Sequence, residues 1–152
     1  MKRLFLLFFS LIIVLFTHAQ QVERDMVILE IGTGTWCPFC PGAAMGADDL
    51  IENGKDVAVI EYHQGDDYQN SAGLSRLNYY SIPAYPTAWF DGGLQVVGGS
   101  SSQSMYSSYL PRYNNRKAIN SSFTIDVTGS YAGLVDFNVD INLEKVHDYT
   151  GG

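Results

Sequence analysis

The sequence predicts a mixed α/β domain followed by a β-rich, sandwich-like segment. Two short apolar runs, 27–31 and 57–62, flank a stretch long enough for a helix, and strands connected in this way pair in parallel. An Asp-Gly-Gly turn at 91–93 separates two further apolar runs, 87–90 and 94–97, and predicts an antiparallel hairpin. The first domain is therefore expected to be a mixed sheet with helices on its faces.

The composition narrows the class of protein. The chain has 152 residues, of which 46% are hydrophobic, and 16 acidic against 9 basic residues give a net charge of −7. This length allows one domain with a small appendage, and the excess of acid disfavours nucleic acid as a partner. Two cysteines can form one disulfide, one dithiol or half of a metal site, but not a multi-disulfide scaffold or a four-cysteine zinc site.

Residues 1–19 have the pattern of a secretory signal peptide. Lys2 and Arg3 precede the apolar run 4–16, and small residues lead to a cleavage point after Ala19. A membrane anchor is the weaker alternative, because the apolar run would span about 20 Å as a helix, against a bilayer core of about 30 Å. We therefore expect an exported protein, in a compartment where disulfides persist.

The first elements of the domain follow from apolar periodicity and from turn residues. Strand 27–31 is apolar except for Glu30, and the stretch 32–35 after it is a loop. Pro38 suits the first turn of a helix 37–53, which an Asn-Gly pair ends.

The rest of the domain continues the alternation of helices and strands. In order, we expect strand 57–62, a polar loop 64–70, helix 71–80 and the hairpin strands 87–90 and 94–97. Ser100 and Gln103 fit a capping box that opens a last helix, which Pro111 should break or kink. The loop acids Asp66, Asp67 and Asp91 are expected to be solvated.

The apolar period changes to two beyond residue 119. Residues 123–128 and 135–144 alternate apolar and polar side chains, as strands with one face in water do. An isolated hairpin is marginal in water, so these strands must pack on the first domain or begin a second β domain. We expect 119–152 to be the start of a truncated second domain, after a domain at 20–118.

The sequence Trp36-Cys37-Pro38-Phe39-Cys40 indicates redox chemistry. Two thiols separated by two residues can close a disulfide ring, and a helix N-terminus favours the thiolate form of a cysteine. Cys37 is expected to be the exposed nucleophile and Cys40 the buried residue that resolves the mixed disulfide. No cofactor is implied.

Two other interpretations of the cysteines stay open. A structural disulfide is one, although so short a loop gives little stabilisation. Metal binding with His63 and His147 as further ligands is the other, although no second CxxC accompanies them.

Residues 27–118 resemble the thioredoxin fold. The likeness rests on WCPFC after a buried strand, on Tyr85-Pro86-Thr87 before the hairpin, and on Phe90-Asp91-Gly92 with Gly98 and Gly99 beyond it. It implies a cis peptide bond before Pro86, packed against the cysteines, and a Tyr85 backbone free to pair with an extended substrate peptide. It also implies that Trp36, Phe39 and Tyr85 surround Cys37 as an apolar rim for peptide segments.

Thioredoxin-like proteins also keep a buried acid on the strand below the cysteines, and Glu30 is the candidate here. It lies seven residues before Cys37, whereas the family spacing is six, and an extra residue in the 32–35 loop could absorb the difference. A strand-end glutamate that faces solvent is the alternative. If Glu30 is buried, desolvation should raise its pKa towards the range of a base near neutrality.

The leader, the cysteine motif and the β-rich tail together are similar to a narrower group of Gram-negative envelope proteins, the outer-membrane-protein-28-like family. This likeness implies the periplasm or outer envelope, with peripheral association with the outer membrane. The preferred function is a thiol–disulfide oxidoreductase that acts on protein thiols and disulfides together with a redox partner protein. The alternative is a non-catalytic envelope protein that uses the fold as a binding scaffold.

Overall fold

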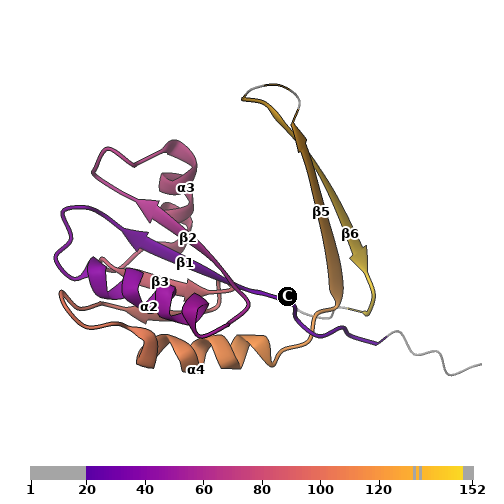
Figure 1. The fold of residues 1–152 in the computed structure, drawn as a ribbon, viewed down its shortest axis with the longest axis horizontal. Coiled ribbons are helices and arrows are strands. Elements are labelled where there is room, and N and C mark those ends of the chain that lie inside the picture. Colours follow the sequence, from indigo (N-terminus) through magenta and orange to yellow (C-terminus); the bar gives the residue numbers. More distant parts are fainter. Residues whose placement is uncertain (1–19, 132, 134, 149–152) are drawn as a thin grey trace, which may run out of the picture. The chain divides into compact units, whose positions relative to one another are not determined.

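The computed structural model describes residues 20–131, 133 and 135–148, and the predicted leader 1–19 lies outside this part of the chain. The chain divides into two units, Arg24–Ile119 and a smaller one that joins residues 20–23 to those from Asn120 onward. Figure 1 shows the helices and strands of both units. Within the described residues, none of the helices has the length and hydropathy of a membrane span.

The larger unit is built on a four-stranded mixed sheet. Its strands are β1 (Val27–Thr33), β2 (Val57–His63), β3 (Thr87–Phe90) and β4 (Leu94–Val97), in the order β2-β1-β3-β4. β1 pairs in parallel with β2, whereas β3 runs antiparallel to both β1 and β4. This is the predicted mixed sheet, and with its helices it forms a thioredoxin-like fold.

Helices flank this sheet on both faces (Figure 1). α2 (Cys40–Glu52) and α4 (Tyr106–Lys117) cover one face, and α3 (Ser71–Tyr80) covers the other. The main core fills the space under α2 and α4; its largest fully buried members are Leu29 and Ile31 of β1, Leu50 of α2, Phe90 of β3 and Tyr109 of α4. Because successive strand residues point to opposite faces, Glu30 lies on the α3 face.

The helix after the cysteine motif begins later than the sequence predicts. α2 starts at Cys40, not at Cys37, and Phe39 is its N-cap residue. Two consecutive turns precede it: the Cys37 N–H donates to the Gly34 carbonyl at 3.0 Å, and the Cys40 N–H donates to the Cys37 carbonyl at 3.4 Å. Cys37 therefore lies in a turn ahead of the helix.

The last helix of the larger unit also departs from the prediction. The Ser100 hydroxyl does accept the Gln103 N–H at 3.0 Å, but the helix begins only at Tyr106. The intervening segment is held against α2, because the Met105 N–H donates to the Gly42 carbonyl at 2.9 Å. Pro111 lies inside α4 and does not break it. Its ring is exposed on the solvent side of the helix, where water can satisfy the carbonyl that loses its partner.

The smaller unit contains the predicted antiparallel strand pair. β5 (Phe123–Tyr131) pairs with β6 (Phe137–Lys145) along their full length. Val22 forms a single antiparallel bridge to Ser121, which ties the segment after the predicted leader to this unit. The apolar face of the sheet is exposed and includes Ile125, Val127, Val139, Ile141 and Leu143. A larger β domain built on this sheet stays a prediction.

Candidate active site

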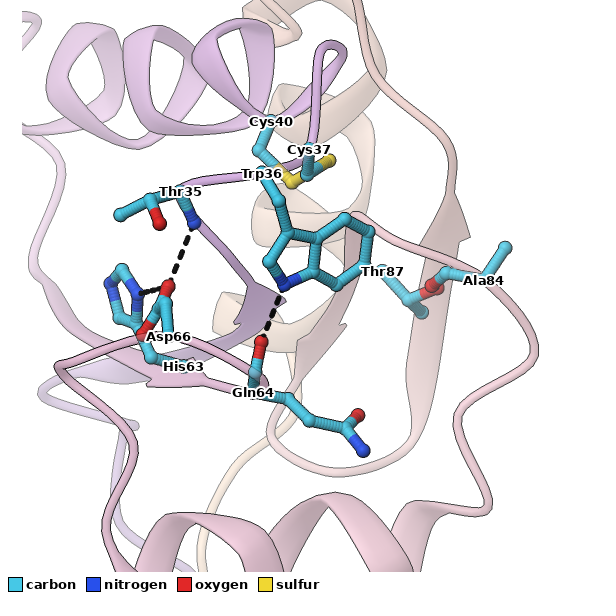
Figure 2. Close-up of a disulfide and its surroundings, with 9 residues drawn as sticks. All are labelled: Thr35, Trp36, Cys37, Cys40, His63, Gln64, Asp66, Ala84 and Thr87. Atoms are coloured by element: carbon cyan, nitrogen blue, oxygen red, sulfur yellow. Dashed lines mark hydrogen bonds and ion pairs between the residues drawn. A yellow bond between two sulfur atoms is a disulfide. The ribbon is translucent and has the colours of Figure 1, made fainter.

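Cys37 and Cys40 form a disulfide at the start of α2 (Figure 2). Their Cα atoms are 5.5 Å apart. Each cysteine is 6% exposed, so the expected contrast between an exposed Cys37 and a buried Cys40 is wrong for this disulfide state. The exposed surface next to the bond comes from Trp36 and Phe39, each 53% exposed. Burial therefore does not decide which sulfur is attacked first.

The N-terminus of α2 offers a thiolate few free donors. Pro41 has no N–H, and the Gly42 N–H donates to the Ser100 carbonyl at 2.7 Å. The Cys40 N–H is already directed at the Cys37 carbonyl. The amide groups that normally stabilise an anion at a helix start are thus largely occupied.

The Tyr85–Pro86 peptide bond is cis, as the resemblance implies. The Pro86 carbonyl accepts the Gly98 N–H at 2.8 Å. Gly99 lies between the Pro86 ring and the Phe39 carbonyl, and a Cβ at this position would be 2.7 Å from Pro86 Cγ. Glycine at position 99 therefore lets the cis-proline lie next to the cysteine turn.

Two of the three predicted rim aromatics are in contact. The rings of Trp36 and Tyr85 meet edge to face with centroids 5.3 Å apart. The Trp36 indole N–H donates to the Gln64 carbonyl at 2.7 Å, which fixes the ring against the loop after β2 (Figure 2). Phe39 is exposed beside the disulfide. The rim thus has one anchored ring pair and one free ring.

Glu30 is buried, but it is not at the disulfide. Its carboxylate accepts two hydrogen bonds from Arg76, at 2.6 Å from Nε and 2.9 Å from Nη2. The hydroxyl of Tyr62 donates to it at 2.9 Å, and the hydroxyl of Tyr80 also donates to it. These partners lie on β2 and α3, on the sheet face opposite α2, and Glu30 is not among the residues that line the cleft at the cysteines.

The pKa of Glu30 shifts in the direction opposite to the prediction. Burial by itself raises the pKa of this carboxyl, but the hydrogen bonds from Arg76, Tyr80 and Tyr62 outweigh it and hold the pKa below its ordinary value of 4.5. Desolvation alone would raise the pKa of Glu30, as the sequence predicts, but Arg76 was not part of that prediction. Glu30 is therefore an ionised partner in a structural network.

Replacing Glu30 by glutamine should lower stability and leave disulfide exchange unchanged. The loss of the charge-assisted hydrogen bonds should reduce the free energy of unfolding by about 2 kcal/mol at pH 7. Because the folded pKa is depressed, this contribution is present above about pH 4.5 and is lost as the pH falls through the folded value. Thermal unfolding of Glu30→Gln against the wild type between pH 3 and pH 7 measures it.

Glu61→Gln is the matched control for Glu30→Gln, since Glu61 is an exposed glutamate on the neighbouring strand. Its stability should stay within about 0.5 kcal/mol of the wild type. A large fall in exchange activity in Glu30→Gln would restore a catalytic role for Glu30.

Sequence reasoning missed the role of Asp66 next to this site. The expectation that it is solvated is wrong, because its side chain is only 6% exposed. Its Oδ2 atom lies 2.7 Å from His63 Nδ1 and accepts the Thr35 N–H at 2.7 Å (Figure 2). The Asp91 side chain is likewise only 8% exposed, in ion pairs with Arg24 and Arg116. The signal for Asp66 was a histidine at a strand end with an acid three residues later.

A cleft of about 200 Å³ borders the disulfide. Besides the two cysteines, it is lined by Thr33, Gly34, Thr35, Pro41, Ala44 and His63. In the part of the chain that the structure describes, no three His, Cys, Asp or Glu side chains lie where they could share a metal ion. His63 and both cysteines thus line the same cleft.

No family model and no curated protein matches the sequence. Among solved structures, the exposed lipoprotein thioredoxin of Streptococcus pneumoniae is similar to this chain with a TM-score of 0.42 and 17% sequence identity, over 61% of this chain and 87% of that chain. The thioredoxin-like fold described above rests on the strand order, the helices and the cysteine pair of this chain itself.

Proposed function

We propose that the chain is a thiol–disulfide oxidoreductase whose reacting couple is Cys37 and Cys40. The observation that carries the proposal is a two-residue-spaced disulfide at a helix start, next to a cis-proline and open to a cleft. In the reduced form, one thiolate attacks a substrate disulfide, so that a mixed disulfide forms and one substrate thiol leaves. The second cysteine then displaces the other substrate thiol; the substrate gains two electrons and the cysteines become a disulfide.

Extended segments of exported proteins are the proposed substrates. No hydrogen bond within the described residues engages the backbone of Tyr85, so its N–H and carbonyl are available to pair with a peptide. Trp36 and Phe39, each next to one of the two cysteines in the sequence, offer exposed aromatic surface at the cysteine motif. A redox partner protein would return the couple to its starting state.

The proposed location is outside the cytoplasm. The leader at 1–19 supports export to the periplasm or outer envelope of a Gram-negative bacterium. Membership of the outer-membrane-protein-28-like group, and peripheral association with the outer membrane, belong to the same proposal. The envelope is oxidising, which fits a protein that works through a disulfide.

A non-catalytic scaffold is the second candidate. The observation that favours it is the low exposure of both cysteines, 6% each, which would suit a disulfide shielded from exchange. In that case the disulfide would persist in glutathione buffers, and the fold would serve to bind a partner.

Equilibration with glutathione redox buffers separates these two functions. For an oxidoreductase, we expect the Cys37–Cys40 couple to exchange within the assay and to show a potential between about −270 and −120 mV. Alkylation of the free thiols followed by mass spectrometry measures the reduced fraction. A couple that stays oxidised, with a potential below about −300 mV, would support the scaffold instead.

A further inference from the structure

We propose that His63, oriented by Asp66, is the residue that transfers protons during exchange at Cys37 and Cys40. The inference rests on the proposed oxidoreductase function and names the acid–base group of the same site. His63 ends β2 directly beside Thr33, where parallel β1 ends and the cysteine loop begins. The two strands thus bring His63 to the end of the sheet from which the cysteine loop leaves. His63 lines the same cleft as Cys37 and Cys40.

Asp66 fixes how the imidazole is held. Its Oδ2 atom is 2.7 Å from His63 Nδ1, and its other oxygen accepts the Tyr68 N–H at 3.0 Å. The hydrogen bond from His63 holds the pKa of Asp66 at about 2, below its usual 3.8, so Asp66 is a carboxylate at neutral pH. A carboxylate only accepts hydrogen bonds, so Nδ1 carries a proton and Nε2 is the nitrogen that gains and loses one.

Asp66 also ties this pair to the cysteine loop. The same Oδ2 atom accepts the N–H of Thr35, two residues before Cys37. The imidazole and the cysteine turn are therefore anchored to one carboxylate (Figure 2). This shared anchor makes Asp66 a positioning residue for both partners of the proton transfer.

No other side chain that lines this cleft can transfer protons to and from the cysteines as His63 can. The titratable groups that face His63 are the two cysteines and, from its own loop, Asp66 and Tyr68. The ring centroid of Tyr68 lies 5.1 Å from that of His63. The remaining side chains lining the cleft come from Thr33, Thr35, Pro41 and Ala44, none of which titrates. Glu30, the other candidate, is bound to Arg76 on the opposite face of the sheet.

The two protons that the substrate thiols gain come from the imidazolium of His63 and from the thiol of Cys40. The thiolate of Cys37 attacks the substrate disulfide, and the leaving substrate thiolate takes a proton from the imidazolium of His63. Neutral His63 then accepts the proton of the Cys40 thiol, and the Cys40 thiolate attacks the mixed disulfide. His63 passes this proton to the second leaving thiolate, so the substrate ends as two thiols and the cysteines as a disulfide.

Single-turnover oxidation of the reduced, full-length protein by an excess of a peptide disulfide tests the proposal. The rate is followed between pH 5 and pH 9 by acid quench and alkylation. His63→Gln should react about 10²-fold more slowly at neutral pH, and its rate should follow a different pH profile from that of the wild type. Added imidazole should restore part of the rate in His63→Ala, which a merely structural role would not allow.

Matched controls separate a specific effect from a general one. His147→Gln removes a histidine that belongs to the other unit and should behave as wild type. Asp66→Asn should slow the reaction and change its pH profile, whereas Asp67→Asn removes the same charge from an exposed neighbour and should do neither.

Each outcome has a definite meaning. A wild type that does not react with the peptide disulfide overturns the oxidoreductase function and this inference together. A wild type that reacts, with a His63→Gln variant of the same rate and pH profile, overturns the inference alone. Thermal unfolding of each variant shows that the fold is retained.

Discussion

Cys37→Ser is expected to reduce the rate of insulin-disulfide reduction to that of the uncatalysed reaction. A serine hydroxyl does not attack disulfide sulfur at neutral pH, because the thiolate is the nucleophile of the exchange. The disulfide seen between Cys37 and Cys40 would also be lost, so no couple could form. Precipitation of insulin chains with dithiothreitol as the reductant measures the rate. Full activity in this variant would exclude Cys37 as the attacking residue.

Cys40→Ser is the matched control, since it also removes the disulfide but leaves the proposed nucleophile. It should trap a mixed disulfide between Cys37 and the substrate, which mass spectrometry detects. The control is needed because both cysteines have the same 6% exposure. If Cys37→Ser were the variant that traps the substrate, the order of the two cysteines would be reversed.

The sheet could be predicted from the sequence because its signals are local. The apolar run that begins at Val27 predicts β1, and the hairpin turn before Leu94 predicts β4. Each signal spans only a few residues, and both strands occur in the structure. The cis bond at Pro86 could be predicted only through the resemblance to thioredoxins. The late start of α4 could not be predicted, because the hydrogen bond between Met105 and Gly42 joins segments far apart in the chain.

The error at Glu30 shows how a strand turns a shift of one residue into a change of face. The family spacing of six residues before Cys37 falls on Ile31, which packs in the core beneath α2 and α4. Glu30, at seven, points to the other face and meets Arg76. An extra residue in the loop after β1 does not move Glu30 to the other face, because the face of each side chain is set by its position along the strand itself. Because Ile31 is apolar, β1 presents no acidic side chain towards α2 at the family position. We therefore assign the acid–base role to His63.

Gly42→Ala is expected to lower the free energy of unfolding by about 3 kcal/mol, although alanine normally favours a helix by about 1 kcal/mol over glycine. An added Cβ would lie 2.6 Å from the carbonyl oxygens of both Ser100 and Gln103. These are backbone atoms, and the Ser100 carbonyl is held by the Gly42 N–H at 2.7 Å, so no side-chain rotation relieves the overlap. For a unit of this size, we expect the melting temperature to fall by roughly 12–24 °C.

Gly73→Ala is the matched control, because Gly73 is the third residue of α3 as Gly42 is of α2. Its nearest neighbour would be Tyr62 Cδ1 at 3.3 Å, a side-chain atom that can yield, so stability should change little. Equal melting temperatures for the two variants would contradict the backbone overlap. Because Gly42 lies two residues after Cys40, separation of α2 from the 100–105 segment should also expose the disulfide, and faster reduction of Gly42→Ala by dithiothreitol would report that movement at the active site itself.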